Sequence, residues 1–175
     1  MNMLTKPYDV VDPKLDLVLE RDVDVAPELV WKAWTIPEHL VHWFTPAPWT
    51  TPFCEIDLRP GGAFTTVMRS PGGEEFPATC CYLEVVPNRK LVWTNALAPG
   101  YRPLDKVTSC PGTDLIYTAI LTLAPVATPA GMGTRYTARV LHKDEGGRQA
   151  MAEMGFLEGW GTALDQLIAF VKKKS

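Results

Sequence analysis

Three residues on strand-like segments of this sequence could carry acid–base or anion-binding chemistry: Arg21, Tyr117 and His142. The guanidinium of Arg21 falls on the inner face of its segment, where it needs a carboxylate such as Asp57 or Glu84, or an anionic ligand group. His142 could bind a ligand carbonyl or act as a general base, or it could bond to backbone at a strand end. Tyr117 could act as an acid or as an oxyanion partner. These residue types leave acid–base catalysis open.

Patterns for metal binding and nucleophilic catalysis are weaker. His39 and His42 lie three residues apart beside Glu38, but no third or fourth ligand is placed by the sequence, and surface histidines explain the spacing. The four cysteines have no C-x-x-C spacing. Ser70 and Ser109 occur in turns with no base at local spacing. We therefore expect no metal, no cofactor and no nucleophilic triad.

The segments that would position these groups alternate with a period of two over most of the chain. Apolar and polar residues alternate over residues 15–25, which indicates a strand with one wet face. A proline at a first-turn position starts a short helix at Pro27, and a second helical turn follows over residues 38–44. Turns rich in proline and glycine separate the later strands, which are predicted over residues 53–58, 63–69, 76–86, 90–96, 115–123 and 134–142.

Alternation also sorts side chains into an inner and an outer face. Arg135, Thr137 and Arg139 share one side of the last strand and are expected to face solvent. Large aromatic and apolar residues fall on inward faces and could line a cavity: Phe64, Met68, Trp93, Tyr117, Tyr136, Phe156 and Trp160. Inward aromatic residues also occur in a plain core. Six tryptophans are many for this length, however, and stiff rings with a few polar groups suit a small-molecule cavity.

The last long apolar segment, residues 154–167, has a helical period and contains three glycines. Each glycine inside a helix costs about 0.5–1 kcal/mol relative to alanine, so another interaction must compensate. One face of the predicted helix is aromatic and aliphatic, and it carries Phe156, Trp160, Leu164, Leu167 and Val171. A neighbouring stripe is nearly bare of side chains, and it consists of Ala152, Gly155, Gly159 and Ala163. A single long helix with these two stripes would close a cavity against a curved sheet.

The order of elements predicts an α+β helix-grip fold. In this arrangement a curved antiparallel sheet of about six or seven strands wraps around a long C-terminal helix, with two short helices after the first strand. Residues 1–13 are expected to form an extended arm, and residues 14–175 one domain. The loop over residues 99–112 could be a mobile lid, or an ordinary surface connection.

Composition excludes several classes of partner. A formal net charge of -3 provides no basic field for a polyanion, so nucleic acid is not expected to bind. No segment approaches the roughly 20 consecutive apolar residues of a membrane span, and the N-terminus has no signal pattern, which favours a cytoplasmic protein without membrane insertion. The sequence leaves open whether two copies form a homodimer.

Several motifs resemble a known family, the activator of Hsp90 ATPase C-terminal-domain-like proteins of the SRPBCC (START-like) superfamily. The similarity extends over residues 15–172 and keeps the order of motifs found in that family. The motifs are residues 21–34 (RDVDVAPELVWKAW), 57–62 (DLRPGG), 82–87 (YLEVVP), 89–93 (RKLVW), 133–135 (GTR) and 155–160 (GFLEGW).

The resemblance implies a container for apolar small molecules, because members of the superfamily bind lipids, polyketides, hormones and aromatic compounds. Chaperone binding belongs to eukaryotic relatives with an additional N-terminal domain; only about 13 residues precede the first strand here, so that role is not expected. The leading hypothesis is a hydrophobic or aromatic ligand bound between sheet and helix. The alternatives are a cyclase-like or hydratase-like enzyme using His142, Arg21 or Tyr117, and a protein-interaction module.

Overall fold

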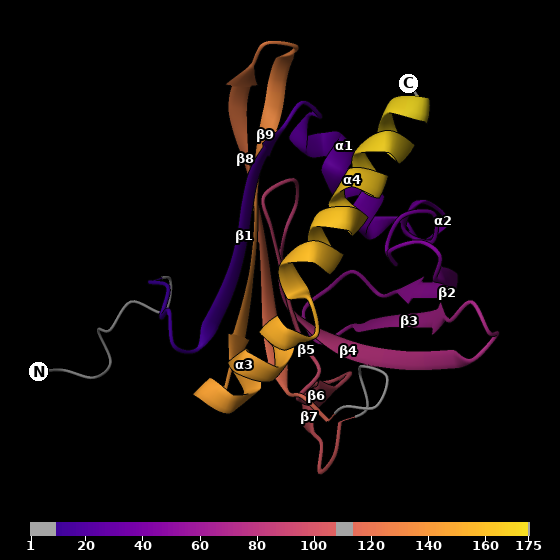
Figure 1. Cartoon of the computed structure of the whole chain (residues 1–175), viewed down its shortest axis with the longest axis vertical. Coiled ribbons are helices and arrows are strands. Elements are labelled where there is room, and N and C mark those ends of the chain that lie inside the picture. Colours follow the sequence, from indigo (N-terminus) through magenta and orange to yellow (C-terminus); the bar gives the residue numbers. More distant parts are fainter. Residues whose placement is uncertain (1–9, 108–113, 175) are drawn as a thin grey trace, which may run out of the picture.

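The computed structural model describes residues 10–107 and 114–174, and its elements follow the predicted order (Figure 1). In chain order they are β1 (Asp16–Val23), α1 (Pro27–Thr35), α2 (Pro37–Leu40), β2 (Thr50–Ile56), β3 (Ala63–Arg69), β4 (Glu75–Val86), β5 (Lys90–Thr94), β6 (Leu97–Ala98), β7 (Arg102–Pro103), β8 (Tyr117–Thr128), β9 (Gly131–His142), α3 (Glu145–Glu153) and α4 (Phe156–Lys174).

Seven of these strands form one antiparallel sheet in the order β1-β9-β8-β5-β4-β3-β2. The sheet curves around α4, which crosses its inner side, and α1 and α2 lie beside α4 on that same side (Figure 1). The α+β helix-grip prediction is therefore confirmed. Because one face of the sheet is covered by helices and the other is not, the strands alternate between apolar and polar residues, as antiparallel sheets of this kind do.

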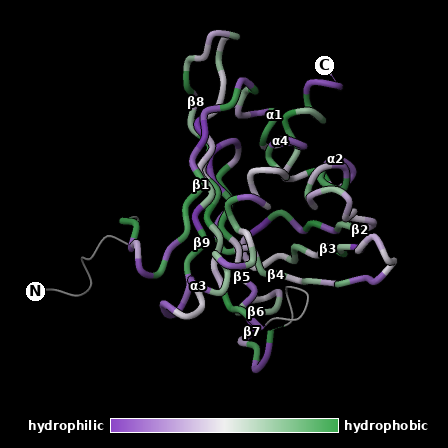
Figure 2. The backbone as a smooth tube through the Cα atoms, in the orientation of Figure 1, coloured by the Kyte–Doolittle hydropathy of each residue, from purple (hydrophilic) through white to green (hydrophobic). Residues whose placement is uncertain are grey.

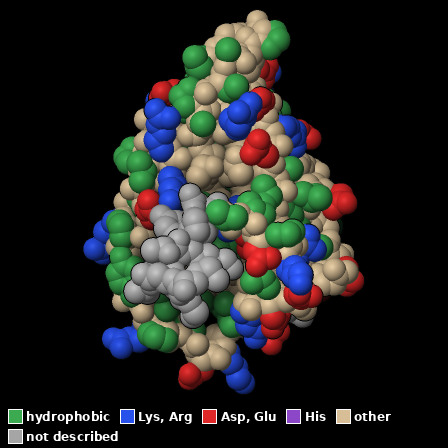
Figure 3. All heavy atoms as spheres, turned by 90° about the vertical axis from the view of Figure 1, so that its left-hand side faces the viewer, with side chains coloured by type: hydrophobic (Ala, Val, Ile, Leu, Met, Phe, Trp, Pro, Cys, Tyr) green, Lys and Arg blue, Asp and Glu red, His purple; other side chains and the backbone are tan. Residues whose placement is uncertain are grey.

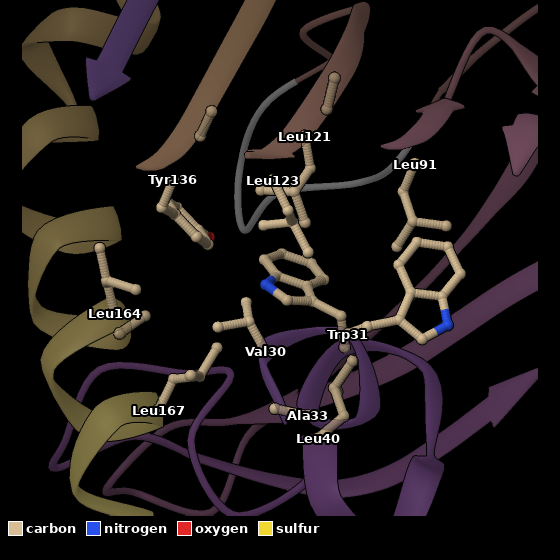
Figure 4. Close-up of a cluster of buried hydrophobic side chains, with 14 of the residues drawn as sticks. Val30, Trp31, Ala33, Leu40, Leu91, Leu121, Leu123, Tyr136, Leu164 and Leu167 are labelled. Carbon is tan, nitrogen blue, oxygen red and sulfur yellow. The ribbon is translucent and has the colours of Figure 1, made fainter. Parts of the chain in front are cut away.

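The inner faces of the strands form the core. Leu121, Leu123 and Tyr136 are almost completely buried, and Leu164 and Leu167 from α4 point toward them and toward Val30 of α1 (Figure 4). Hydrophobic segments follow the strands and α4, whereas α3 is mainly hydrophilic (Figure 2). No side chain of α3 is fully buried. The sheet and α4 therefore supply most of the buried area.

The prediction of a single long C-terminal helix is wrong in one respect. The helix is divided into α3 and α4, and Gly155 lies between them with φ of +88°. A left-handed residue cannot continue an α-helix, and glycine adopts this conformation without steric cost. Gly155 is thus the residue at which the chain changes direction, and of the three glycines in residues 154–167 only Gly159 and Gly161 occur inside a helix.

The prediction that Arg139 faces solvent is also wrong. Arg139 is on the outer face of β9, yet it is only 8% exposed, because residues 10–15 cover it. Its guanidinium donates to the buried carboxylate of Asp16 at 2.7 Å and to the carbonyl oxygen of Val10 at 2.9 Å. On the rest of the face turned away from α4, acidic and basic side chains are interspersed (Figure 3). The alternating pattern placed Arg139 on the correct face of β9, but it could not predict that another segment packs over this residue.

The segment predicted as the loop 99–112 overlaps a short hairpin, because β7 lies within it and β6 just before it. The hairpin packs on the turn between β2 and β3. The amide of Gly100 donates to the carbonyl of Gly61 at 2.7 Å. A Cβ atom at Gly61 would be 2.9 Å from the ring of Tyr101, so only glycine fits there. Residues 108–112 of this loop and residues 1–9 of the predicted arm lie outside the described residues. Among the described residues, each helix is too short or too polar to cross a bilayer.

Candidate ligand-binding cavity

A cavity of about 360 Å³ lies between the sheet, α1 and the corner that joins α3 to α4. None of the residues around it carries a charge, and all but the hydroxyl-bearing Tyr117 have apolar, aromatic or absent side chains. They are Trp34, Trp43, Phe44, Pro46, Met68, Trp93, Tyr117, Val140, Met151, Met154, Gly155, Phe156, Gly159, Trp160 and Ala163. A cavity of ~150 Å³ accommodates benzene, so this volume suits a ligand of roughly two or three rings.

The bare stripe of the C-terminal helix creates part of this space. Gly155, Gly159 and Ala163 all line the cavity, and a Cβ atom added to Gly159 would meet nothing within 4 Å. In an ordinary helix this position would carry a side chain that fills the space. The cavity reaches the surface at the α3–α4 corner, where Met154 lines it and is 49% exposed.

Aromatic rings form the inner wall. The ring of Trp34 is 5.3 Å from that of Trp93 and 6.1 Å from that of Trp160, measured between centroids. Trp43 meets Trp34 edge-on at 4.9 Å, and its indole N–H donates to the carbonyl of Ala33 at 3.1 Å. These distances lie in the range of favourable aromatic pairs, so the wall is held by ring–ring contacts as well as by burial.

Five of the seven residues predicted to line the cavity do so, and two lie behind its wall. Met68, Trp93, Tyr117, Phe156 and Trp160 are part of the lining. Phe64 instead stacks on Tyr82 at 5.5 Å and meets Trp93 edge-on. Tyr136 is completely buried, and its hydroxyl accepts a hydrogen bond from the indole N–H of Trp160 at 2.8 Å.

Other lining residues were missed by sequence reasoning. Most come from the segment after β1 and from the helix corner, and one comes from β9; they are Trp34, Trp43, Phe44, Pro46, Val140, Met151 and Met154. Val140 lies on the predicted inner face of β9, so alternation could have found it. The cluster of aromatic residues after β1 was a usable signal for the others in that segment, because an apolar helix face must pack on the sheet. The position of Met151 and Met154 depends on the turn at Gly155.

The three residues considered for catalysis are not brought together. Tyr117 lines the cavity, with its hydroxyl 3.7 Å from the sulfur of Cys80. Arg21 pairs with Asp165 of α4 and donates to the carbonyl of Gly161 at 3.2 Å, so the expected ion pair exists but with neither Asp57 nor Glu84. Both side chains of this pair lie outside the lining.

His142 also lies outside the lining. It is buried at the end of β9, and its Nδ1 is 3.0 Å from the carbonyl of Leu15. This is the backbone-bonded arrangement expected for a strand-end histidine. A carbonyl oxygen only accepts, so Nδ1 is the donor in this hydrogen bond. Nε2 has no partner among the described residues.

The histidine pair on α2 contacts α4. The ring of His42 stacks on Phe170 at 5.1 Å, and the ammonium of Lys174 donates to Nε2 of His39 at 3.0 Å. Burial, followed by the charge of Lys174, lowers the pKa of His39, so the neutral form that accepts this bond is favoured. Within the described ranges, no cluster of three or more histidine, cysteine, aspartate or glutamate side chains could hold a metal ion.

Ionisable groups in the core around the cavity are held neutral. Burial raises the pKa of Tyr82 and of Tyr136 above the ordinary value for tyrosine, and it raises the pKa of Cys54 to about 12. None of these groups is charged near pH 7. Together with a lining that has no charged side chain, this favours uncharged ligands, because a lone ion would lose its hydration without gaining a partner.

A helix-grip sheet around an apolar cavity defines the structural class of this protein. The chain belongs to the Activator of Hsp90 ATPase homolog 1-like protein family, whose model matches residues 24–172. This confirms the resemblance seen in the sequence motifs. No curated protein matches the chain.

Several solved structures are similar over nearly the whole chain. A protein from Nitrosomonas europaea is 44% identical, covers 94% of this chain and 98% of its own, and superposes with a TM-score of 0.83. A protein from Rhodobacter sphaeroides is 20% identical with a TM-score of 0.76, covering 95% of this chain and 98% of its own. A protein from Arthrobacter aurescens is 23% identical with a TM-score of 0.71, covering 91% and 87% respectively. The last two establish the fold alone.

Proposed function

We propose that this protein binds a hydrophobic or aromatic small molecule in the cavity between the sheet and α4. The observation that carries the proposal is a lining of fifteen residues without a charged side chain, around a space of about 360 Å³. Ligand sites are commonly concave, mostly apolar and of about 300–1,000 Å³. The family and its fold are compatible with this role.

The positions of the ionisable residues favour binding over catalysis. An enzyme of the cyclase or hydratase type needs an acid or base in contact with its substrate. Of the three candidate residues only Tyr117 lines the cavity, whereas His142 and Arg21 lie outside it and each has a partner elsewhere in the fold. An interaction module would favour a filled interior and an apolar outer patch, whereas this interior contains a cavity.

The first experiment is native mass spectrometry of freshly purified protein, followed by equilibrium dialysis against two-ring aromatic compounds. We expect a bound species of low mass, or dissociation constants in the micromolar range. Gly159→Leu fills open space in the cavity and should weaken binding by at least about tenfold, because the added side chain occupies the ligand's volume.

Ala169→Leu is the matched control, because Ala169 is exposed on the same helix, outside the lining. It should leave binding unchanged. Equal affinities for Gly159→Leu and the unaltered protein would place the ligand elsewhere and contradict the proposal, as would the absence of binding to any two-ring compound.

A further inference from the structure

One side chain of α4, that of Gln166, holds the backbone of the loop over residues 43–47. Its Nε2 donates to the carbonyl oxygens of Trp43 and Thr45, both at 2.9 Å. Its Oε1 accepts from the amide of Ala47, also at 2.9 Å. Three backbone groups within five residues of chain therefore bind the same side chain.

This set of partners requires an amide at position 166. A backbone carbonyl only accepts and a backbone N–H only donates, so the side chain must supply two donor protons and one acceptor. An ionised glutamate supplies no donor, a lysine no acceptor and a methionine no donor. The same partners fix the orientation of the amide, with Nε2 toward the two carbonyls and Oε1 toward the N–H.

The residue whose position depends most directly on these bonds is Pro46, which is partly buried and lines the cavity. Its neighbours in the chain, Thr45 and Ala47, each supply one of the bonded backbone groups. The proline ring fixes φ at about −65° and has no N–H, so its place follows from the backbone on either side. Gln166 thus determines where Pro46 lies in the cavity wall.

Phe44, the other lining residue between Trp43 and Ala47, is less dependent on Gln166. Its ring meets those of Trp34 and Phe64 edge-on, in both cases at 5.9 Å between centroids. Contacts of this kind stabilise the ring whether or not the backbone bonds are made.

The helix that carries Gln166 also lines the cavity. Ala163 is three residues before Gln166 and belongs to the lining, whereas Gln166 does not. Residues three apart lie side by side on a helix surface. The amide of Gln166 therefore holds Pro46 at a fixed spacing from the cavity-lining stripe of α4, and it does so without lining the cavity itself.

We propose that Gln166 is a positioning residue that sets the width of the cavity between Pro46 and α4, and that it thereby selects narrow planar ligands of two or three rings over wider ones. This inference rests on the proposed function and specifies the shape of the ligand. With the loop fixed, the wall at Pro46 does not yield to a wider ring system; without the three bonds it can move away from α4.

Two aromatic hydrocarbons test this proposal: naphthalene, which is narrow, and pyrene, a wider ring system. Dissociation constants are measured by equilibrium dialysis for the unaltered protein, Gln166→Glu and Gln166→Met. Gln166→Glu keeps the length of the side chain but places a carboxylate against two carbonyls, and Gln166→Met removes all three bonds. In both variants the affinity for pyrene relative to naphthalene should rise by about fivefold or more, the size of at least one typical hydrogen bond.

The use of two variants keeps the test decisive if one of them fails to fold, which thermal unfolding of each protein reports. Ala169→Glu is the control, because it adds a carboxylate to an exposed position one turn from Gln166, outside the lining. It should leave the ratio of the two affinities unchanged. A shift of the same size in Ala169→Glu would show that charge on α4, rather than release of the loop, is the cause.

The outcomes separate the two proposals. Absence of binding by both probes to the unaltered protein contradicts the proposed function itself. Binding with an unchanged ratio of affinities in the Gln166 variants overturns the role of Gln166 and leaves the cavity as a binding site. Equal losses of affinity for both probes overturn it as well, because they would show a general loss of structure rather than a wider cavity.

Discussion

Arg21 of β1 and Asp165 of α4 form an ion pair that joins the first strand of the sheet to the C-terminal helix. The guanidinium also donates to the carbonyl of Gly161, one turn earlier on the same helix. The absence of a side chain at Gly161 allows this approach, because a Cβ atom there would be 3.3 Å from the guanidinium. The pair holds the wall of the cavity against the sheet.

Replacing Asp165 with asparagine should lower the free energy of unfolding by about 0.5–1 kcal/mol, since the side chains of the pair are 35% and 68% exposed and largely screened. The loss should shrink in 1 M salt. Urea denaturation at two salt concentrations measures both effects. Asp22→Asn, which breaks an exposed pair with Arg135 within the sheet, is the control. A loss for Asp165→Asn that does not depend on salt would show that charge attraction is not the cause.

Replacing Gly155 or Gly159 with alanine should change the stability of the fold in opposite directions. Gly155→Ala forces a side chain into a left-handed conformation at the helix corner and should destabilise the fold by about 1 kcal/mol. Gly159→Ala removes a glycine from a helix and meets no neighbour, so it should stabilise by about 0.5–1 kcal/mol. Thermal unfolding of the two variants provides the comparison. Changes of the same sign in both would contradict the division of the helix at Gly155.

Removing one partner of the buried pair between Asp16 and Arg139 should be the most damaging single change among these predictions. Their side chains are 4% and 10% exposed, so Asp16→Leu leaves a guanidinium in the interior without a counter-charge. The expected loss is about 3–5 kcal/mol in the free energy of unfolding. The double variant Asp16→Leu with Arg139→Met should recover most of it, because both buried charges are gone. Equal destabilisation in the single and double variants would argue that hydrogen bonds to residues 10–15, rather than the charge, account for the loss.

Cys54 should be unreactive in the folded protein and should make stability fall at alkaline pH. Burial, and secondarily the charge of Glu38, raises the pKa of its thiol from 9.0 to about 12. At pH 8 about one thiol in 10⁴ is therefore ionised, and iodoacetamide should modify Cys54 only after unfolding, as peptide mapping would detect.

The sign of the pH effect follows from that shift. The stabilising contribution of the neutral Cys54 thiol is fully present below about pH 9 and is lost as the pH rises toward about 12, because the unfolded chain releases the proton first. Cys54→Ser removes this contribution. The free energy of unfolding of the unaltered protein should approach that of Cys54→Ser as the pH is raised from 8 to 11. A constant difference between the two proteins over this range would contradict the prediction.

Much of the fold was predictable because its strands have one solvent-exposed face and one buried face, which gives them an alternating pattern of polar and apolar residues. Alternation placed Tyr136, Ala138 and Val140 on the inner face of β9, and all three are buried. The same argument failed for Arg139, because a strand's own pattern carries no information about a distant segment that packs over it. The partner of Arg21 was missed for a similar reason: sequence spacing does not show which carboxylate of which element comes within reach.

The cavity itself was predicted through the bare stripe of the C-terminal helix, although the stripe was assigned to one continuous helix. The period of Phe156, Trp160 and Leu164 was correct for α4. Gly155 was misassigned because glycine in a helical pattern has two meanings, a tolerated interior residue or a left-handed end, and periodicity alone does not separate them. Because the turn at Gly155 was not predicted, Met151 and Met154 were not recognised as residues of the cavity lining.

The weak attachment of α3 bears on the rate at which a ligand could enter and leave. The C-terminal half of α4 is tied to the loop after α2 by the side chain of Gln166, which donates to the carbonyls of Trp43 and Thr45 at 2.9 Å and accepts from the amide of Ala47. α3 has no fully buried side chain. Local opening should therefore be frequent in α3 and rare in α4, a contrast that amide hydrogen exchange resolves. Changes in α3 that leave Met151 of the cavity lining intact would then alter association and dissociation rates together, with little effect on affinity.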